Sequence, residues 1–212
     1  DIERISDGLF YGCNRLKNVT LSNSMKVLGD AAFENCTALE EITLPDSVTT
    51  VGTYCFYNCD SLTDVTWSAN AVTIPERCFN DCDALTSVVI PEGTTTIGYR
   101  AFYGSNNLKN ISMPGTVTGI SDGAFNGVAV TTVGPVGGGY DYEFGWTETI
   151  PSNAFREMSK LTSVVIPEGI TSIGSYAFYY CSSLTRVSIS DSVTEIRSNA
   201  FCGCSSLKRV PG

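Results

Sequence analysis

The sequence predicts a parallel β-solenoid of about nine 23-residue turns, and three periodic features carry this prediction. An aromatic residue recurs every 23 positions, with one gap of 30. An aliphatic residue stands five positions before each aromatic, and in all but one unit a leucine stands six positions after it. Because no such unit can bury its apolar face alone, neighbouring units must stack. The aromatic anchors are Phe10, Phe33, Phe56, Phe79, Phe102, Phe125, Phe155, Phe178 and Phe201.

Each unit contains two extended segments and one turn. Apolar residues stand nine and eleven positions after the anchor, as at Ile42 and Leu44. This alternation, rich in β-branched residues, is typical of a short strand with one buried face. Pro, Ser, Asp or Gly then turns the chain, and a second extended piece such as 48–51 leads to the next anchor. A return path of roughly 20 residues makes successive strands parallel. We expect each anchor segment, such as 30–36, to be a short helical or 3₁₀ turn.

Composition excludes several classes of function. The chain has 13 basic and 22 acidic residues, for a net charge of −9, which argues against binding to nucleic acid. It has no histidine, so histidine-based catalysis and metal ligation are excluded. No apolar run reaches the roughly 18 residues of a membrane span, so we expect no membrane insertion. We expect residues 1–212 to form a single solenoid, a monomer that is incomplete at both ends.

The repeat also has a recognisable pattern, LxxVxIPxxVTxIGxxAFxxCxxL, from Leu85 to Leu108 and again from Leu161 to Leu184. This pattern resembles the BspA-like leucine-rich repeats of bacterial and protist surface proteins. The resemblance covers the chain except for about 134–149. It implies a leucine-rich-repeat solenoid, a right-handed curved superhelix with a concave parallel β-sheet. It also implies an extracellular or cell-surface location and adhesion to host matrix glycoproteins or other cells.

Six of the nine cysteines occupy one column, three positions after the anchor. We interpret this column as buried core, since free cysteine behaves as a small hydrophobe; disulfides between neighbouring units are the alternative for an extracellular protein. Cys55–Cys59 and Cys78–Cys82 have the spacing of a zinc motif, but the repeat itself produces that spacing. We therefore expect no metal and no cofactor. The column contains Cys13, Cys36, Cys59, Cys82, Cys181 and Cys204.

The outward side chains of the strands are the expected partner-binding surface on the concave face. They form a floor of small residues, with acidic residues toward one end and arginine toward the other. A second explanation stays open, because Thr and Val favour a pleated, half-exposed position whatever the function. The expected contact residues are Thr20, Thr43, Thr66, Val89, Ser112, Val165, Ser188 and Arg186.

The lengthened unit contains an insertion at 134–149, in which three consecutive glycines at 137–139 precede four aromatic residues that alternate with acids. We expect the glycines to act as a flexible hinge and the insertion to hang over one rim of the solenoid. Aromatic side chains supply large contact areas at interfaces and stack on sugars, so this loop is a candidate for partner contact. The alternative is a self-packed flap over irregular core. The four aromatic residues are Tyr140, Tyr142, Phe144 and Trp146.

No set of titratable groups in the repeat converges as a catalytic site requires, so we expect no enzyme activity. The sequence favours a non-catalytic protein-interaction or adhesion module of a secreted or cell-surface protein. Its partner would be a protein, such as a host matrix glycoprotein. Two alternatives remain: a structural spacer without a ligand of its own, and glycan binding by the aromatic loop.

Overall fold

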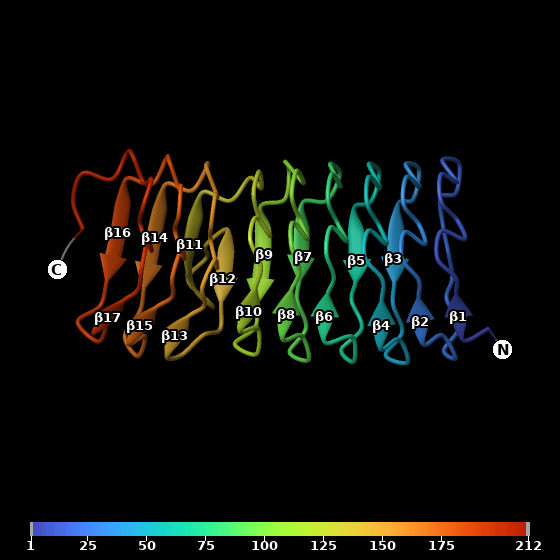
Figure 1. The fold of residues 1–212 in the computed structure, drawn as a ribbon, viewed down its shortest axis with the longest axis horizontal. Helices are drawn as coiled ribbons and strands as arrows, with labels where there is room; N and C mark the ends of the chain where they lie inside the picture. Colours follow the sequence, from blue (N-terminus) through green and yellow to red (C-terminus); the bar gives the residue numbers. More distant parts are fainter. Residues whose placement is uncertain (1, 211–212) are drawn as a thin grey trace.

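The computed structural model describes residues 2–210 as a rod of about eight stacked turns, with the two termini at opposite ends (Figure 1). Each regular turn contributes one strand to each of two rows. Every strand pair is parallel, as predicted. Helices are absent from residues 2–210. The prediction of short helical or 3₁₀ anchor segments is therefore wrong, and these segments are runs of turns instead.

The longer strands lie side by side in what we call the major sheet. Residues 23 positions apart face each other across it, as Ile42 and Val65 do. One two-stranded ladder, β3–β5, is followed by a six-stranded ladder from β7 to β16. In spatial order the strands are β3 (Glu41–Thr43), β5 (Asp64–Thr66), β7 (Ser87–Val89), β9 (Asn110–Met113), β12 (Tyr142–Phe144), β11 (Thr132–Pro135), β14 (Ser163–Ile166) and β16 (Arg186–Ile189).

The shorter strands form three minor sheets, which two prolines separate. In a regular turn the residue after the short strand donates its N–H to the previous turn, as Gly52 does to the Leu28 carbonyl at 2.8 Å. Pro75 and Pro151 occupy this position and have no N–H, so the ladder stops there. The minor sheets are β1 (Arg4–Ile5), β2 (Val27–Leu28) and β4 (Thr50–Val51); β6 (Thr73–Ile74), β8 (Thr96–Ile97) and β10 (Gly119–Ile120); β13 (Thr149–Ile150), β15 (Ser172–Ile173) and β17 (Glu195–Ile196).

The anchor segments form a third ladder. The amides of Tyr54 and Phe56 donate to the carbonyls of Glu76 and Cys78 in the next turn, at 2.9 and 3.0 Å. In every unit the residues two before and two after the anchor have positive φ, for example 58° at Tyr54 and 56° at Asn58. A right-handed helix cannot pass through left-handed residues. This explains why no helix forms here.

The core is a stack of phenylalanine rings along the axis of the rod. Successive ring centroids lie 4.9–5.5 Å apart and their planes are within 21° of parallel. The stack is interrupted between Phe125 and Phe155, where Tyr142 lies edge-on to both rings, at 5.6 and 5.0 Å. The interior of the rod is therefore continuous through the insertion, although the repeat is not.

The cysteine column is a column of hydrogen-bond donors. The thiol of Cys59 donates to the Phe33 carbonyl at 3.3 Å, and that of Cys82 donates to the Phe56 carbonyl at 3.2 Å. Ser105 makes the same contact to the Phe79 carbonyl at 2.7 Å. All nine cysteines are free; within the column Cys13 is exposed and Cys204 is half-buried, while the other four are buried. The column therefore tolerates either a thiol or a hydroxyl because both satisfy a buried carbonyl.

We predict that the unfolded, unreduced protein shows nine free thiols and that the native protein reacts rapidly only at Cys13 and Cys202, the two exposed cysteines. Burial raises the pKa of Cys36 to about 11 and that of Cys82 to about 12, so the reactive thiolate is scarce at pH 8. Titration with Ellman's reagent before and after denaturation measures both quantities. Fewer than nine thiols after denaturation would mean that disulfides link the turns.

Candidate functional site

The structure brings the predicted contact residues together in one row on the outer face of the major sheet. Thr43 faces Thr66, Val89 faces Ser112, and Val165 faces Ser188 across neighbouring strands. These side chains are exposed, except for Val165, which is half-buried. Thr20 and Arg186 are exposed at the two ends of the row.

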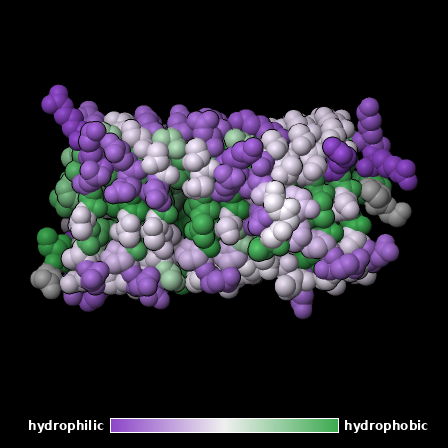
Figure 2. Space-filling view, turned by 180° about the vertical axis from the view of Figure 1, so that it is seen from behind, coloured by the Kyte–Doolittle hydropathy of each residue, from purple (hydrophilic) through white to green (hydrophobic). Residues whose placement is uncertain are grey.

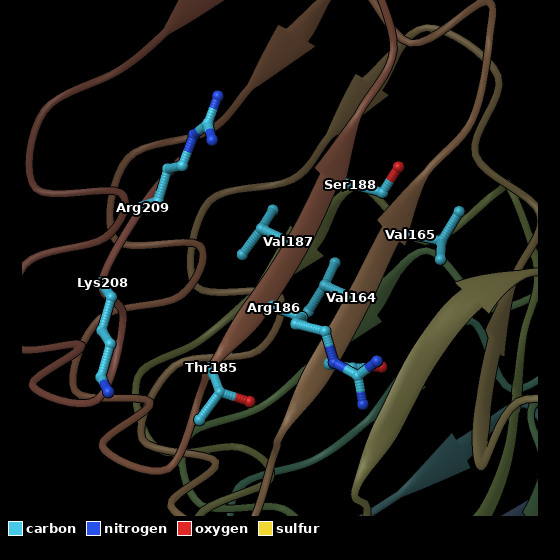
Figure 3. Close-up of a pocket in the computed structure, with 9 residues that line it drawn as sticks. Val164, Val165, Thr185, Arg186, Val187, Ser188, Lys208 and Arg209 are labelled. Carbon is cyan, nitrogen blue, oxygen red and sulfur yellow. The ribbon is translucent and has the colours of Figure 1, made fainter. Parts of the chain in front are cut away.

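This outer face is hollowed at several places. A hollow of about 530 Å³ lies at the C-terminal end between β14 and β16 and includes Lys208 and Arg209. Figure 3 shows Arg186 reaching from β16 toward β14, with Val165 and Ser188 on the same side. A smaller hollow of about 190 Å³ lies beside Tyr140. In the space-filling view of Figure 2, polar residues line both long margins and hydrophobic residues are visible between them.

The insertion re-enters the major sheet instead of hanging over a rim. Its strand β12 lies between β9 and β11 and is parallel to both. At its ends, Ile111 donates its N–H to the Asp141 carbonyl and Gly145 donates to the Met113 carbonyl, both at 2.9 Å. The insertion is thus an extra strand of the sheet, so the expected hanging loop is wrong, while the alternative that the insertion covers irregular core is confirmed by the packing of Tyr142 and Trp146 against Phe155.

Three of the four insertion aromatics are buried. Tyr142, Phe144 and Trp146 are 0%, 1% and 6% exposed, because alternate residues of β12 point into the core while Glu143 points outward. The expectation that these three contact a partner is therefore wrong. Tyr140 is half-buried and is the insertion aromatic that reaches the outer face.

Tyr142 brings a polar group into this core. Burial raises the pKa of its hydroxyl, and within the described residues that hydroxyl has no hydrogen-bond partner. The Trp146 indole, by contrast, donates to the Val117 carbonyl at 2.7 Å. Both large rings fill the space that the interrupted phenylalanine stack leaves.

The glycines of the insertion permit close packing and do not form a free hinge. A Cβ at Gly134 would come within 2.3 Å of the Tyr140 ring. The Glu143 carboxylate accepts the amides of Gly137, Gly139 and Tyr140 at 3.1, 2.7 and 3.3 Å. These hydrogen bonds lower the pKa of Glu143. The loop under Tyr140 is therefore held in one conformation.

Side chains replace the missing backbone ladder across the insertion. Asn153 donates to the Ile120 carbonyl at 3.2 Å, the group left free by Pro151. Arg156 pairs with Asp122 at 2.7 Å. The sequence carries a signal for Arg156 alone, since its column, one position after the anchor, holds tyrosine in four other units.

The described residues also limit the chemistry of the site. Within residues 2–210 no three Cys, Asp or Glu side chains converge where they could hold a metal ion. No helix in this part of the chain is long and apolar enough to cross a membrane. The outer face thus offers small hydroxyls, the exposed Val89, the half-buried Val165, and charges at its two ends and at Glu143.

The comparisons identify the family. The BspA type leucine-rich repeat region matches residues 3–131 and 146–211, and the chain belongs to this family. The unmatched residues between these ranges contain β11 and β12. No curated protein matches the chain. Leucine-rich repeat domains generally mediate protein interactions, and this family is typically non-enzymatic.

Solved structures share the fold. A leucine-rich repeat protein from Bacteroides ovatus is 28% identical, with a TM-score of 0.72 over 97% of this chain; the chain spans 57% of that protein's length. The Treponema pallidum leucine-rich repeat protein TpLRR is 22% identical, with a TM-score of 0.55 over 86% of this chain and 72% of its own. The pneumococcal vaccine antigen PcpA is 21% identical, with a TM-score of 0.57 over 91% of this chain and 49% of its own.

We predict that Tyr142→Phe leaves the free energy of unfolding unchanged or raises it by about 1 kcal/mol, because it removes a buried hydroxyl without a partner. Tyr142→Ala should lower it by about 3–5 kcal/mol, because it removes the ring contacts as well. Urea denaturation followed by circular dichroism measures both changes. A loss above about 1 kcal/mol in Tyr142→Phe would show that the hydroxyl has a partner in solution.

A second prediction concerns Glu143. Because its folded-state pKa is lowered, the contacts to Gly137 and Gly139 persist above that pKa and are lost as the pH falls through it. The amide NMR shifts of the two glycines should therefore titrate together, with a midpoint below the usual range of a glutamate. In Glu143→Gln this titration should disappear. If the glycine amide shifts still titrated in Glu143→Gln, the titration would arise from another carboxyl group.

Proposed function

We propose that this chain is a non-catalytic interaction module of a secreted or cell-surface protein, and that it binds a protein partner through the outer face of the major sheet. The observation that carries the proposal is the row of small side chains along this face, which Glu143 of β12 and Gly134 of β11 interrupt between Ser112 and Val165. Val89, 68% exposed, lies within it, and Tyr140 stands beside it. Exposed apolar side chains among hydroxyls suit a protein partner.

The distribution of charge supports a protein partner of mixed charge. Glu41 and Asp64 lie side by side toward the N-terminal end of the face. Arg186, Lys208 and Arg209 surround the hollow at the other end. Such a gradient orients a partner along the rod and speeds its encounter. A host matrix glycoprotein fits this description, through its polypeptide and not its sugars, because the insertion presents only Tyr140 for stacking.

A structural spacer is the second candidate, and the burial of Tyr142, Phe144 and Trp146 favours it. Exposed aromatic residues in the insertion would indicate a binding surface, which a spacer does not need. Buried aromatic residues fill the core where the repeat is interrupted, and a solenoid needs this whether or not it binds a partner.

Binding to a panel of matrix glycoproteins and glycans tests the proposal. Val89→Asp combined with Val165→Asp should weaken saturable binding at least tenfold, because each places a charge in the contact row. Val72→Asp is the matched control, since Val72 is also exposed (51%) but lies outside the outer face, beside β6. Binding that survives the double variant would exclude the outer face, and the absence of binding to every member would favour the spacer.

A further inference from the structure

The major sheet is open between β5 and β7. Among residues 2–210 no backbone hydrogen bond joins these two strands, whereas β3 pairs with β5 and β7 pairs with β9. The two strands also stand apart in Figure 1. A groove of about 370 Å³ lies between them on the outer face.

The groove reaches the core. Val65 points inward like Ile42 and Val88 in the neighbouring turns, which are 1% and 5% exposed, yet Val65 is half-buried. Trp67 lies beneath the groove, in the column that holds Leu44 in the preceding turn. Its ring is edge-on to Phe79 at 5.6 Å. A side chain larger than leucine thus separates the two turns.

Two strand edges face each other across this groove. Thr66 accepts a hydrogen bond from Leu44 at 2.9 Å, so the backbone N–H and C=O of Thr66 face β3. Because the N–H and C=O of successive residues face opposite sides of a strand, those of Val65 and Trp67 face β7. By the same argument from the bond between Ile90 and Ser112, the N–H and C=O groups of Ser87 and Val89 face β5. Unpaired strand edges recognise another extended backbone.

The turn interface at the groove is bonded along one side only. Pro75 interrupts the minor ladder between β4 and β6, at the same interface where the major ladder is open. The remaining backbone links are those of the anchor ladder, from Tyr54, Phe56 and Asn58 to the next turn, and one from Ala84 to the Asp60 carbonyl at 3.1 Å, just after the anchor segment. The interface can therefore widen on the sheet side while the anchor side stays joined.

The chain itself fills a comparable opening. At Pro151 the second minor-ladder break occurs, and there β12 lies between β9 and β11 and pairs with both. The major sheet thus accepts an added strand between two turns. We propose that the groove between β5 and β7 binds an extended peptide segment of the protein partner as an added strand. This inference rests on the proposed function and names the kind of partner it requires.

The test uses a phage-displayed library of random nine-residue peptides. Phage that bind the wild-type chain are retained, and phage that also bind the double variant W67L/P75G are removed. Leucine and glycine are the residues that the repeat places at these positions, at Leu44 and Gly52, so the double variant should fold and close the groove. The selected peptides, made synthetically, should bind the wild type at least tenfold more tightly than the variant. N-methylation of alternate peptide residues should abolish binding, because it removes the backbone donors.

Hydrogen exchange then locates the peptide. The amides of Ser87 and Val89 should exchange at least tenfold more slowly when the peptide is bound. No enriched peptide, or enriched peptides that leave these amides unprotected, would overturn the inference. A matrix glycoprotein that binds W67L/P75G and the wild type equally well would also overturn it, while the proposed function would stand, because the outer-face row is intact in that variant.

Discussion

Each phenylalanine anchor stacks on the anchor of the next turn, except between Phe125 and Phe155, and this stacking governs the rest of the structure. A ring spacing of 4.9–5.5 Å demands that every turn rise by about one strand separation. The chain must therefore return to the same angular position after 23 residues, as the register of Ile42 with Val65 shows. An extra segment cannot be accommodated inside a turn without breaking this stack, so the insertion is absorbed as a strand of its own, and Tyr142 takes the place of a ring.

Two interfaces depart from the regular pattern, and the same kinds of residue mark both. Pro75 and Pro151 end the minor ladders, and Trp67 and Trp146 are the two tryptophans of the chain. A proline removes one ladder donor, and a tryptophan needs more space than the leucine or isoleucine of a regular turn. At one interface the chain supplies β12 to fill the space. At the other the space between β5 and β7 remains.

The sequence predicted the parallel strands, the buried columns and the outer-face row, because period and alternation depend only on repeated local chemistry. It did not predict the left-handed anchor turns, since residues such as Tyr54 adopt positive φ only because the ladder to the next turn compensates for the strain. The burial of Tyr142 and Phe144 could have been predicted. Their alternation with Glu143 is itself a strand pattern, although the three glycines that precede Tyr140 are typical of a loop.

A solenoid of identical turns presents the same surface at every turn, so a partner bound to it has no unique register. Departures from the repeat supply that register. The open edges of β5 and β7 lie near the middle of the rod, and Tyr140 stands over the outer face at the next strand, β9. Leaving a ladder unmade forgoes about 1 kcal/mol for each hydrogen bond. In the regular turns these hydrogen bonds are made. At the opening between β5 and β7 they are missing, so a bound peptide can form them there.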